Sequence, residues 1–282
     1  MTWMVGALLS FCLMAVGARE LSGEINTAQV MLFRSTLGLV VISLILWATK
    51  QTALIHSPRI GLHCVRNGFH FMGQYGWLVG ITLLPLAEVF ALEFTVPLWT
   101  ALIAWLCLGE ALTLRKLSAI LLGLLGVMVI VKPGMAVFNL SSFIVLGAAC
   151  CYAISHTSTK SLAVTESPLT ILFYMSLVQL PLGLLLTLNH WTTPTLQQGG
   201  WLFIIGATAL TAHFCMAKAM QHAEVSIVVI LDFMRLPAIG MVGAVLYGES
   251  LAPSLFIGAL IMLIGNLFAL WQPKTAVKTL KS

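Results

Sequence analysis

Apolar runs, each about as long as a bilayer is thick, follow one another through nearly the whole of this 282-residue chain. A helix needs about 20 apolar residues to cross the hydrocarbon core, so ten crossings would use about 200 residues and leave about 80 for connections. Hydrophobic residues make up 60% of the chain and charged residues 8%, whereas soluble domains have about 45–50% and about 25%. So few charges could not cover a water-soluble globule. The sequence therefore predicts an all-α integral membrane protein.

Turn residues and charges separate ten predicted membrane-spanning segments. The breakers include Ser57-Pro58, Lys132-Pro133-Gly134 and Ala252-Pro253, which are residue types that end regular structure. The connections are short, which predicts that consecutive helices run up and down beside one another. The predicted segments are 2–18, 27–48, 61–83, 88–108, 113–131, 141–160, 168–188, 198–218, 224–247 and 252–271.

The basic residues predict how the segments are oriented, because cytoplasmic loops carry an excess of Lys and Arg. With the N-terminus inside, only Arg19 and Lys132 fall on the outer side. The inner side then holds Lys50, Arg59, Arg115, Lys116, Lys160, Lys218, Lys274, Lys278 and Lys281. An even number of crossings places both termini in the cytoplasm. We expect a multi-pass protein of a cell membrane, the bacterial inner membrane.

One motif occurs twice in the chain. Leu92-Glu93-Phe94 and Leu231-Asp232-Phe233 are each followed by a proline and then by Gly-Glu, at Gly109-Glu110 and Gly248-Glu249. After five crossings the chain is on the other side of the membrane, so a second copy of a five-helix unit must be inverted. Inverted repeats are typical of secondary transporters. We expect the first five-helix repeat at residues 1–135 and the inverted second, with a short cytoplasmic tail, at 136–282.

This pattern resembles the EamA type of the drug/metabolite transporter superfamily. The resemblance covers nearly the whole chain, and its mark is a helix with a mid-helix proline that ends in Gly-Glu. It implies a central cavity lined mainly by the third, fourth, eighth and ninth segments, and transport by alternating access between the two halves. Members of the family carry amino acids, nucleotide-like metabolites, vitamins and drugs. The matching residues are Pro97, Gly109 and Glu110 in the fourth segment, and Pro237, Gly248 and Glu249 at the ninth.

Five ionisable residues stand out because they fall well inside predicted helices, where a charge costs at least about 2.5–3.5 kcal/mol. Asp232 and Arg235 are three positions apart and can pair on one helix turn, either as a structural pair or as part of a site. Glu93 has no partner on its own helix, so we expect it to pair with Arg34, to face a wet cavity or to stay protonated. Burial favours the neutral form of a carboxyl group, so Glu93 or Asp232 is the candidate proton carrier. The fifth residue is Arg66.

The segment 61–83 carries a polar stripe at helical spacing. Polar groups cannot be satisfied against lipid, so we expect this face to point into the bundle or a cavity, either as a site or as helix-to-helix hydrogen bonds. The stripe consists of His63, Arg66, Asn67, His70, Gln74 and Trp77. The predicted substrate-binding and coupling residues are Glu93, Asp232, Arg235, Arg34, Arg66, His70, Gln74, Trp77 and His213.

Other features predict structural roles. Glu110 and Glu249 each close a helix, where a negative charge opposes the helix dipole. We expect Glu110 either to cap its helix or to pair with Arg115 and Lys116, and we expect neither glutamate to bind substrate. Glycines spaced along two segments predict close helix packing. They are Gly73, Gly76 and Gly80, and Gly123 and Gly126.

Several function classes are not expected. The chain has no Gly-rich phosphate loop for an ATP-driven pump and no His-Glu-x-x-His or Gly-x-Ser-x-Gly motif for an enzyme. It also lacks Cys-x-x-Cys pairs and polybasic stretches, so we expect no metal site, no cofactor and no nucleic acid partner.

We predict a secondary carrier for a small polar organic metabolite, an amino acid or an amino-acid-derived compound. The family resemblance alone implies efflux ahead of uptake. The intramembrane charges, three basic and two acidic, favour zwitterionic or anionic solutes. One alternative is uptake of a vitamin or a nucleoside-like cofactor such as S-adenosylmethionine. Another is a non-transporting receptor, a scaffold or an intramembrane enzyme. The expected partners are the metabolite, the bilayer and protons as coupling ion, and no particular oligomeric state is predicted.

Overall fold

The computed structural model describes residues 2–21, 24–83, 89, 92–131, 140–188, 191–248 and 253–270, and this part of the chain is helical and contains no β-strand. The predicted all-α class is confirmed. The helices are α1 (Thr2–Glu20), α2 (Thr27–Ala48), η1 (Thr52–Ile55), α3 (Ile60–Leu83), α5 (Val96–Leu108), α6 (Leu114–Val131), α7 (Leu140–Ala163), α8 (Pro168–Thr187), α9 (Leu196–His222), α10 (Val225–Leu231), η2 (Asp232–Met234), α11 (Arg235–Tyr247) and α12 (Pro253–Leu270).

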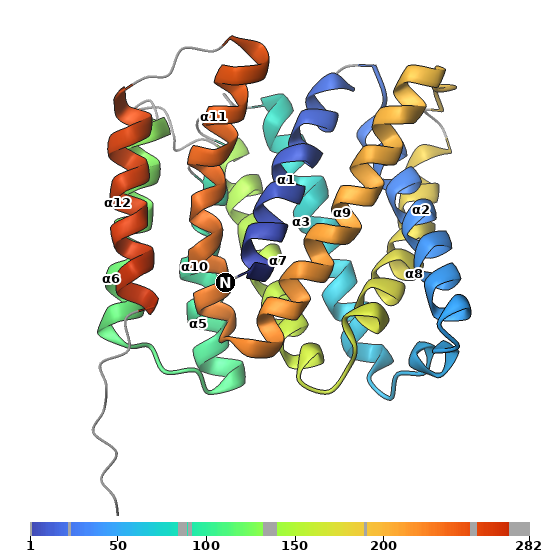
Figure 1. The fold of residues 1–282 in the computed structure, drawn as a ribbon, viewed down its shortest axis with the longest axis horizontal. Coiled ribbons are helices and arrows are strands. Elements are labelled where there is room, and N and C mark those ends of the chain that lie inside the picture. Colours follow the sequence, from blue (N-terminus) through green and yellow to red (C-terminus); the bar gives the residue numbers. More distant parts are fainter. Residues whose placement is uncertain are drawn as a thin grey trace, which may run out of the picture.

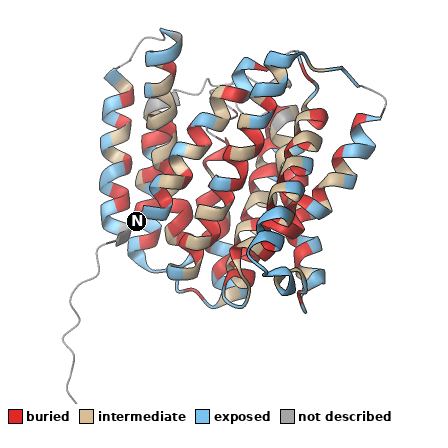
Figure 2. Ribbon diagram, turned by 45° about the vertical axis from the view of Figure 1, so that its right-hand side comes forward, coloured by how far each residue is buried: buried red, intermediate tan, exposed pale blue. Residues whose placement is uncertain are grey.

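The outer surface of the bundle is apolar. Trp47 is 74% exposed, and Leu106, Leu185 and Phe256 also point outward. Figure 2 shows exposed residues along the outer sides of the helices and buried residues along their inner sides. Soluble proteins rarely expose such extensive apolar surface, so this surface faces lipid. Five stretches are long and apolar enough to cross a membrane: Thr2–Glu20, Thr27–Ala48, Pro168–Thr187, Leu196–His222 and Val225–Leu246.

Eight of the ten predicted segments correspond to single helices, but the fourth and ninth do not. The predicted segment 224–247 is interrupted by the 3₁₀ turn η2, between α10 and α11. In the predicted segment 88–108, α5 begins only at Val96, after a turn at residues 94–95, and residues 88 and 90–91 lie outside the described residues. The prediction of a single uninterrupted helix for each of these two segments is therefore wrong.

Proline explains both breaks. Pro97 lies in the first turn of α5, and Pro237 is the third residue of α11. The proline ring removes one N–H donor and clashes with the turn before it, so a regular α-helix does not continue through these positions. The resemblance implied a proline in the middle of each helix. In the structure both prolines instead lie near the start of a helix.

The same two helices also end alike. Gly109 after α5 has φ 68° and Gly248 after α11 has φ 65°. This left-handed conformation is the usual glycine stop of a helix, because a Cβ would be strained there. The repeated Gly-Glu motif is therefore a repeated helix end, although Glu249 itself lies outside the described residues.

The helices form a bundle whose members pack in pairs. The most extensive contacts join α3 with α7, α6 with α12, α1 with α9, and α2 with α8. In Figure 1, α6 and α12 lie at one edge, α2 and α8 lie at the other, and α1, α3, α7 and α9 are between them.

Glycines bring these pairs close together. A Cβ added to Gly80 of α3 would overlap the side chain of Val145 of α7, and one added to Gly126 of α6 would lie 2.8 Å from the carbonyl oxygen of Gly258 of α12. Small residues permit such close approach of membrane helices. The predicted packing role of these glycines is confirmed.

Candidate functional site

A cavity of about 750 Å³ lies inside the bundle, within the usual range for small-molecule sites. It reaches the end of the bundle where α1 joins α2 and α8 joins α9, and is lined there by the exposed residues Glu24, Asn26 and Thr192. We call this the mouth end; it is uppermost in Figure 1. None of the described connections at the opposite, closed end (49–59, 109–113, 164–167 and 223–224) lines the cavity.

Eight of the nine predicted site residues line this cavity: Arg34, His70, Gln74, Trp77, Glu93, His213, Asp232 and Arg235. The third, fourth, eighth and ninth segments contribute as the resemblance implied, and α1, α2 and α7 contribute as well. The exception is Arg66, which is not among the described lining residues. Its guanidinium donates hydrogen bonds to Thr159 of α7 (3.0 Å) and to the side-chain oxygen of Asn67 (2.5 Å).

Two carboxylates share one guanidinium at the cavity wall. Nη2 of Arg235 lies 2.8 Å from Glu93 Oε1 and 3.1 Å from Asp232 Oδ2. The indole N–H of Trp77 donates a 2.7 Å hydrogen bond to the other oxygen of Glu93. The guanidinium carbon also lies 5.2 Å from the centre of the Phe11 ring, a cation–π distance. The predicted pairing of Asp232 with Arg235 is confirmed, and it forms part of a larger cluster.

The expected partnership of Arg34 with Glu93 is wrong. Nη2 of Arg34 donates 2.8 Å hydrogen bonds to the amide oxygens of Gln74 in α3 and Gln179 in α8. Gln74 and Trp77 lie on one face of α3. Gln74 accepts a hydrogen bond from Arg34, and Trp77 donates one to Glu93. Arg34 is 7% exposed, and among the described residues no carboxylate forms an ion pair with it.

Three contributors were not predicted. Tyr152 and His156 of α7 line the cavity, and their spacing of four positions in an apolar segment is a signal that could have identified them. Gln179 supports Arg34, and its Nε2 also lies 2.8 Å from Nδ1 of His70. Its partners are more than 100 positions away, so local spacing carries no signal for it.

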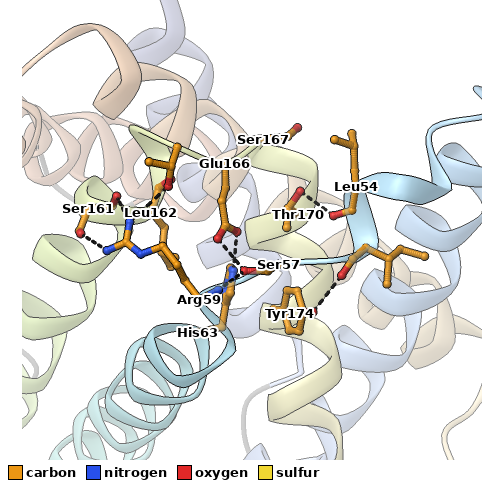
Figure 3. Close-up of polar contacts among 12 residues, drawn as sticks. Leu54, Ser57, Arg59, His63, Ser161, Leu162, Glu166, Ser167, Thr170 and Tyr174 are labelled. Carbon is orange, nitrogen blue, oxygen red and sulfur yellow. Dashed lines mark hydrogen bonds and ion pairs between the residues drawn. The ribbon is translucent and has the colours of Figure 1, made fainter.

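At the closed end, Glu166 joins α3 to the connection between α7 and α8. It accepts a 2.6 Å hydrogen bond from the hydroxyl of Ser57, and its other oxygen lies 2.6 Å from Nε2 of His63 (Figure 3). Beside it, Arg59 donates to the backbone oxygen (2.8 Å) and the hydroxyl (2.7 Å) of Ser161. His63, which the polar stripe included, therefore contributes to the closure of this end.

A second cluster at the closed end surrounds Glu110. Lys116 lies 3.3 Å from Glu110 and 2.5 Å from Glu224, which confirms the predicted pairing of Glu110 with Lys116. Glu110 also accepts hydrogen bonds from the backbone N–H of Val225 (2.8 Å) and from the hydroxyl of Ser226 (2.7 Å). A carboxylate at the N-terminus of α10 is favoured by the helix dipole. Both clusters tie residues before position 132 to residues after position 139.

The contacts across the mouth end are different in kind. The side chain of Gln29 donates to the backbone oxygen of Thr192 (2.5 Å) and accepts from its N–H (3.0 Å). Gln198 donates a 2.6 Å hydrogen bond to the exposed Glu24. Gln29 is fully buried, whereas Glu24 and Thr192 at the opening of the cavity are exposed.

Comparisons with known proteins agree with this architecture. The chain is 24% identical to an S-adenosylmethionine uptake transporter of Rickettsia bellii over 98% of this chain and 94% of the relative. It is 30% identical to a riboflavin transporter of Vibrio cholerae, over 96% and 93%. A pseudopaline exporter of Pseudomonas aeruginosa is 26% identical over 80% of each chain. These relatives are named as transporters of small molecules.

Two further comparisons concern the fold and the family. A solved crystal structure superposes with a TM-score of 0.82 at 15% identity and covers 95% of each chain, which shows the same fold. The sequence model of the EamA-like transporter family matches residues 1–132 and again residues 139–271. Together these matches include nearly all of the chain. The chain is thus a multi-pass membrane protein, and it belongs to the EamA-like transporter family.

Proposed function

We propose that this protein is a secondary carrier that moves a small polar organic metabolite through the central cavity by alternating access. The observation that carries the proposal is the cavity itself. It is lined by intramembrane charges, reaches one end of the bundle and stops short of the other end, where side chains of the two halves are bonded together. A carrier needs such a site with one end open and the other closed.

The packing pattern supports two inverted halves, residues 1–135 and 136–282. Replacing each helix by the one five crossings away exchanges the α1–α9 pair with the α3–α7 pair, and it exchanges α2–α9 with α8–α3. The α2–α8 and α6–α12 pairs map onto themselves. The separate family matches to 1–132 and 139–271 also support a duplication. Inverted halves with similar packing can interchange roles, which gives two states of comparable energy.

The distribution of basic residues supports an assignment of the two ends. The loops predicted to be cytoplasmic include 49–59, 109–113 and 164–167, and these lie at the closed end. The described conformation is therefore proposed to be open to the outside, with the Glu110 and Glu166 clusters holding the cytoplasmic side shut. In the opposite state these clusters separate and the contacts around Gln29 and Thr192 tighten.

For the solute, our first candidate is an amino acid or an amino-acid-derived compound, moved outward. Uptake is the second candidate, because the relative named as an S-adenosylmethionine uptake transporter matches 98% of this chain. Direction follows from the coupling ion, for which we propose the proton, carried by Glu93 or Asp232.

Metabolite profiling of cells that overexpress the protein tests this function, with counterflow of the compound found in proteoliposomes as the second step. A compound that accumulates outside identifies an exporter, and one that accumulates inside identifies an importer. Counterflow of a labelled solute distinguishes a carrier from an enzyme, a receptor or a scaffold. An unchanged metabolite profile together with absent counterflow would refute the carrier function.

A further inference from the structure

The central cavity has two poles of opposite formal charge. At one pole Arg34 is held by two neutral amides. At the other, Glu93 and Asp232 share the single guanidinium of Arg235, which leaves a formal charge of −1. All four residues line the cavity, so a bound solute meets both poles.

The positive pole lacks a counter-ion in the part of the chain that the structure describes. A buried cation is costly unless an anion and hydrogen bonds compensate it. Both described hydrogen bonds of Arg34 leave from Nη2, and no described bond leaves from Nη1 or Nε. A guanidinium offers five N–H donors in a planar fork that fits a carboxylate with two parallel bonds. Arg34 is therefore equipped to take an anionic oxygen pair from the solute.

The negative pole has an unused acceptor. Oδ1 of Asp232 is buried and has no hydrogen-bond partner among the described residues, whereas Oδ2 holds Arg235. An unsatisfied buried acceptor costs free energy, and a donor on the solute would remove that cost. Because the pole carries excess negative charge, a cationic donor such as an ammonium group fits it best.

The two poles are neighbours along one helix. Arg34 is bonded to Gln74 and Glu93 to Trp77, and both of these lie on α3. Positions three apart on a helix are separated by about 4.5 Å of rise and share one face. Because Arg34, Glu93 and Asp232 all line one cavity, a solute that carries both charges can meet both poles.

We propose that the transported solute is a zwitterion of the amino acid type, with its carboxylate bound by Arg34 and its protonated amine bound by Asp232. This inference rests on the proposed carrier function and its first candidate solute, and it adds the residue that recognises each charge. Gln74 and Gln179 act as positioning residues, because they fix the plane of the Arg34 guanidinium.

Affinity selection tests the assignment and requires no choice of solute in advance. The purified full-length protein in lipid nanodiscs is incubated with a total small-molecule extract of the cells that produce it, and the retained compounds are identified by mass spectrometry. We expect retained compounds to carry both a carboxylate and an amine. Retention only of compounds without a carboxylate, or only of compounds without an amine, would overturn the inference while leaving the carrier function in place.

Two variants then separate the poles. Arg34→Gln should lower retention of the zwitterion at least about tenfold, which corresponds to about 1.4 kcal/mol, and Arg34→Lys should retain part of it. Asp232→Asn should lower retention of the zwitterion, but it should leave retention of the N-acetylated form of the same compound unchanged. The matched control is Arg115→Gln, which removes an exposed guanidinium at the closed end and should bind like the wild type. Unchanged retention in folded Arg34→Gln protein would contradict the proposed role of this residue.

Defined probes provide a second measurement on the unaltered protein, so that the result does not depend on a variant that folds poorly. S-adenosylmethionine and its decarboxylated analogue differ only in the carboxylate, and methionine and its amide form a second such pair. In at least one pair, the acid should stabilise the protein against heat more than its partner does. Equal effects within both pairs would count against recognition of a carboxylate. If nothing from the extract is retained and counterflow is absent, the carrier function fails together with the inference.

Discussion

Arg235 of α11 donates a 2.8 Å hydrogen bond to Glu93, although the two residues are 142 positions apart. Glu93 belongs to the first copy of the repeated motif, and Asp232, its counterpart in the second copy, takes the same guanidinium at 3.1 Å. The two copies therefore meet at a single cation. Because one guanidinium compensates both carboxylates, the loss of either carboxylate changes the electrostatic environment of the other.

The shared guanidinium makes a specific prediction about stability. Arg235→Gln leaves two formally charged carboxylates facing each other and should destabilise the fold by about 3–5 kcal/mol, the usual cost of breaking a buried pair. Adding Glu93→Gln removes one of these charges, so the double variant should melt at a higher temperature than Arg235→Gln alone. Thermal unfolding in detergent measures the melting temperatures of the single and double variants and so ranks their stabilities. A double variant less stable than both single variants would show that the residues do not interact as described.

Proton coupling gives a second prediction. If Glu93 or Asp232 carries the proton, then Glu93→Gln or Asp232→Asn should abolish accumulation of the solute driven by a pH gradient. Counterflow should persist in Glu93→Gln, because exchange of solute needs no net movement of protons, whereas Asp232→Asn should also weaken counterflow because it removes a proposed contact to the solute. Proteoliposomes with and without an imposed pH gradient separate the two activities. If both folded variants kept full pH-driven accumulation, neither carboxylate would be the proton carrier.

The Glu110 cluster predicts how the conformational equilibrium responds to mutation. Glu110→Gln weakens hydrogen bonds to a charged group, each worth about 1.5–3 kcal/mol, so the closed end should open more often, by about tenfold or more. A cysteine placed at Met216 in the cavity wall, in a background without reactive cysteines, reports this opening through a membrane-impermeant thiol reagent applied from either side.

Glu24→Gln is the matched control for this experiment, because it makes the same chemical change at the mouth end. It should not raise labelling from the closed side. Equal labelling from that side in Glu110→Gln and in the parent protein would mean that the cluster does not hold the end shut.

Helix packing gives a fourth prediction. A methyl group at Gly126 would lie 2.8 Å from the carbonyl oxygen of Gly258 and 2.6 Å from Met262, so Gly126→Ala should separate α6 from α12 and cost about 1–3 kcal/mol. Gly147→Ala is the control, since nothing lies within 4 Å of the added carbon. That variant should be neutral or gain up to about 1 kcal/mol from helix propensity. Equal melting temperatures of the two variants would argue against close packing at Gly126.

Local contacts could be predicted from the sequence, and distant ones could not. Asp232 and Arg235 pair because three positions bring them together on one turn, and Lys116 reaches Glu110 across six positions. The predicted partner of Glu93 was wrong because the partner depends on which helices are neighbours: Glu93 bonds to Trp77 and Arg235, and Arg34 bonds to Gln74 and Gln179. The stripe on α3 correctly indicated a cavity-facing side, but it could not show that Arg66 and His63 bond to the α7 region.

Two further features escaped prediction for physical reasons. Glu166 is in a connection, where a carboxylate is usually solvated, yet its side chain is 7% exposed because Ser57 and His63 enclose it. The prolines marked the fourth and ninth segments correctly. The sequence did not show where the regular helix would begin relative to each proline: α5 begins one residue before Pro97, and α11 begins two residues before Pro237.

Gly123 of α6 is far from the solute in the usual sense, since α6 contributes none of the described residues that line the cavity. A Cβ there would nevertheless overlap the ring of Phe233, which is fully buried and lies between Asp232 and Arg235 in sequence. The absence of a side chain at one position in an outlying helix thus leaves room for Phe233, which is a sequence neighbour of Asp232 in the proposed site. If the cavity binds solute as proposed, substitutions in the scaffold can change selectivity, and a survey restricted to the walls of the cavity would overlook them.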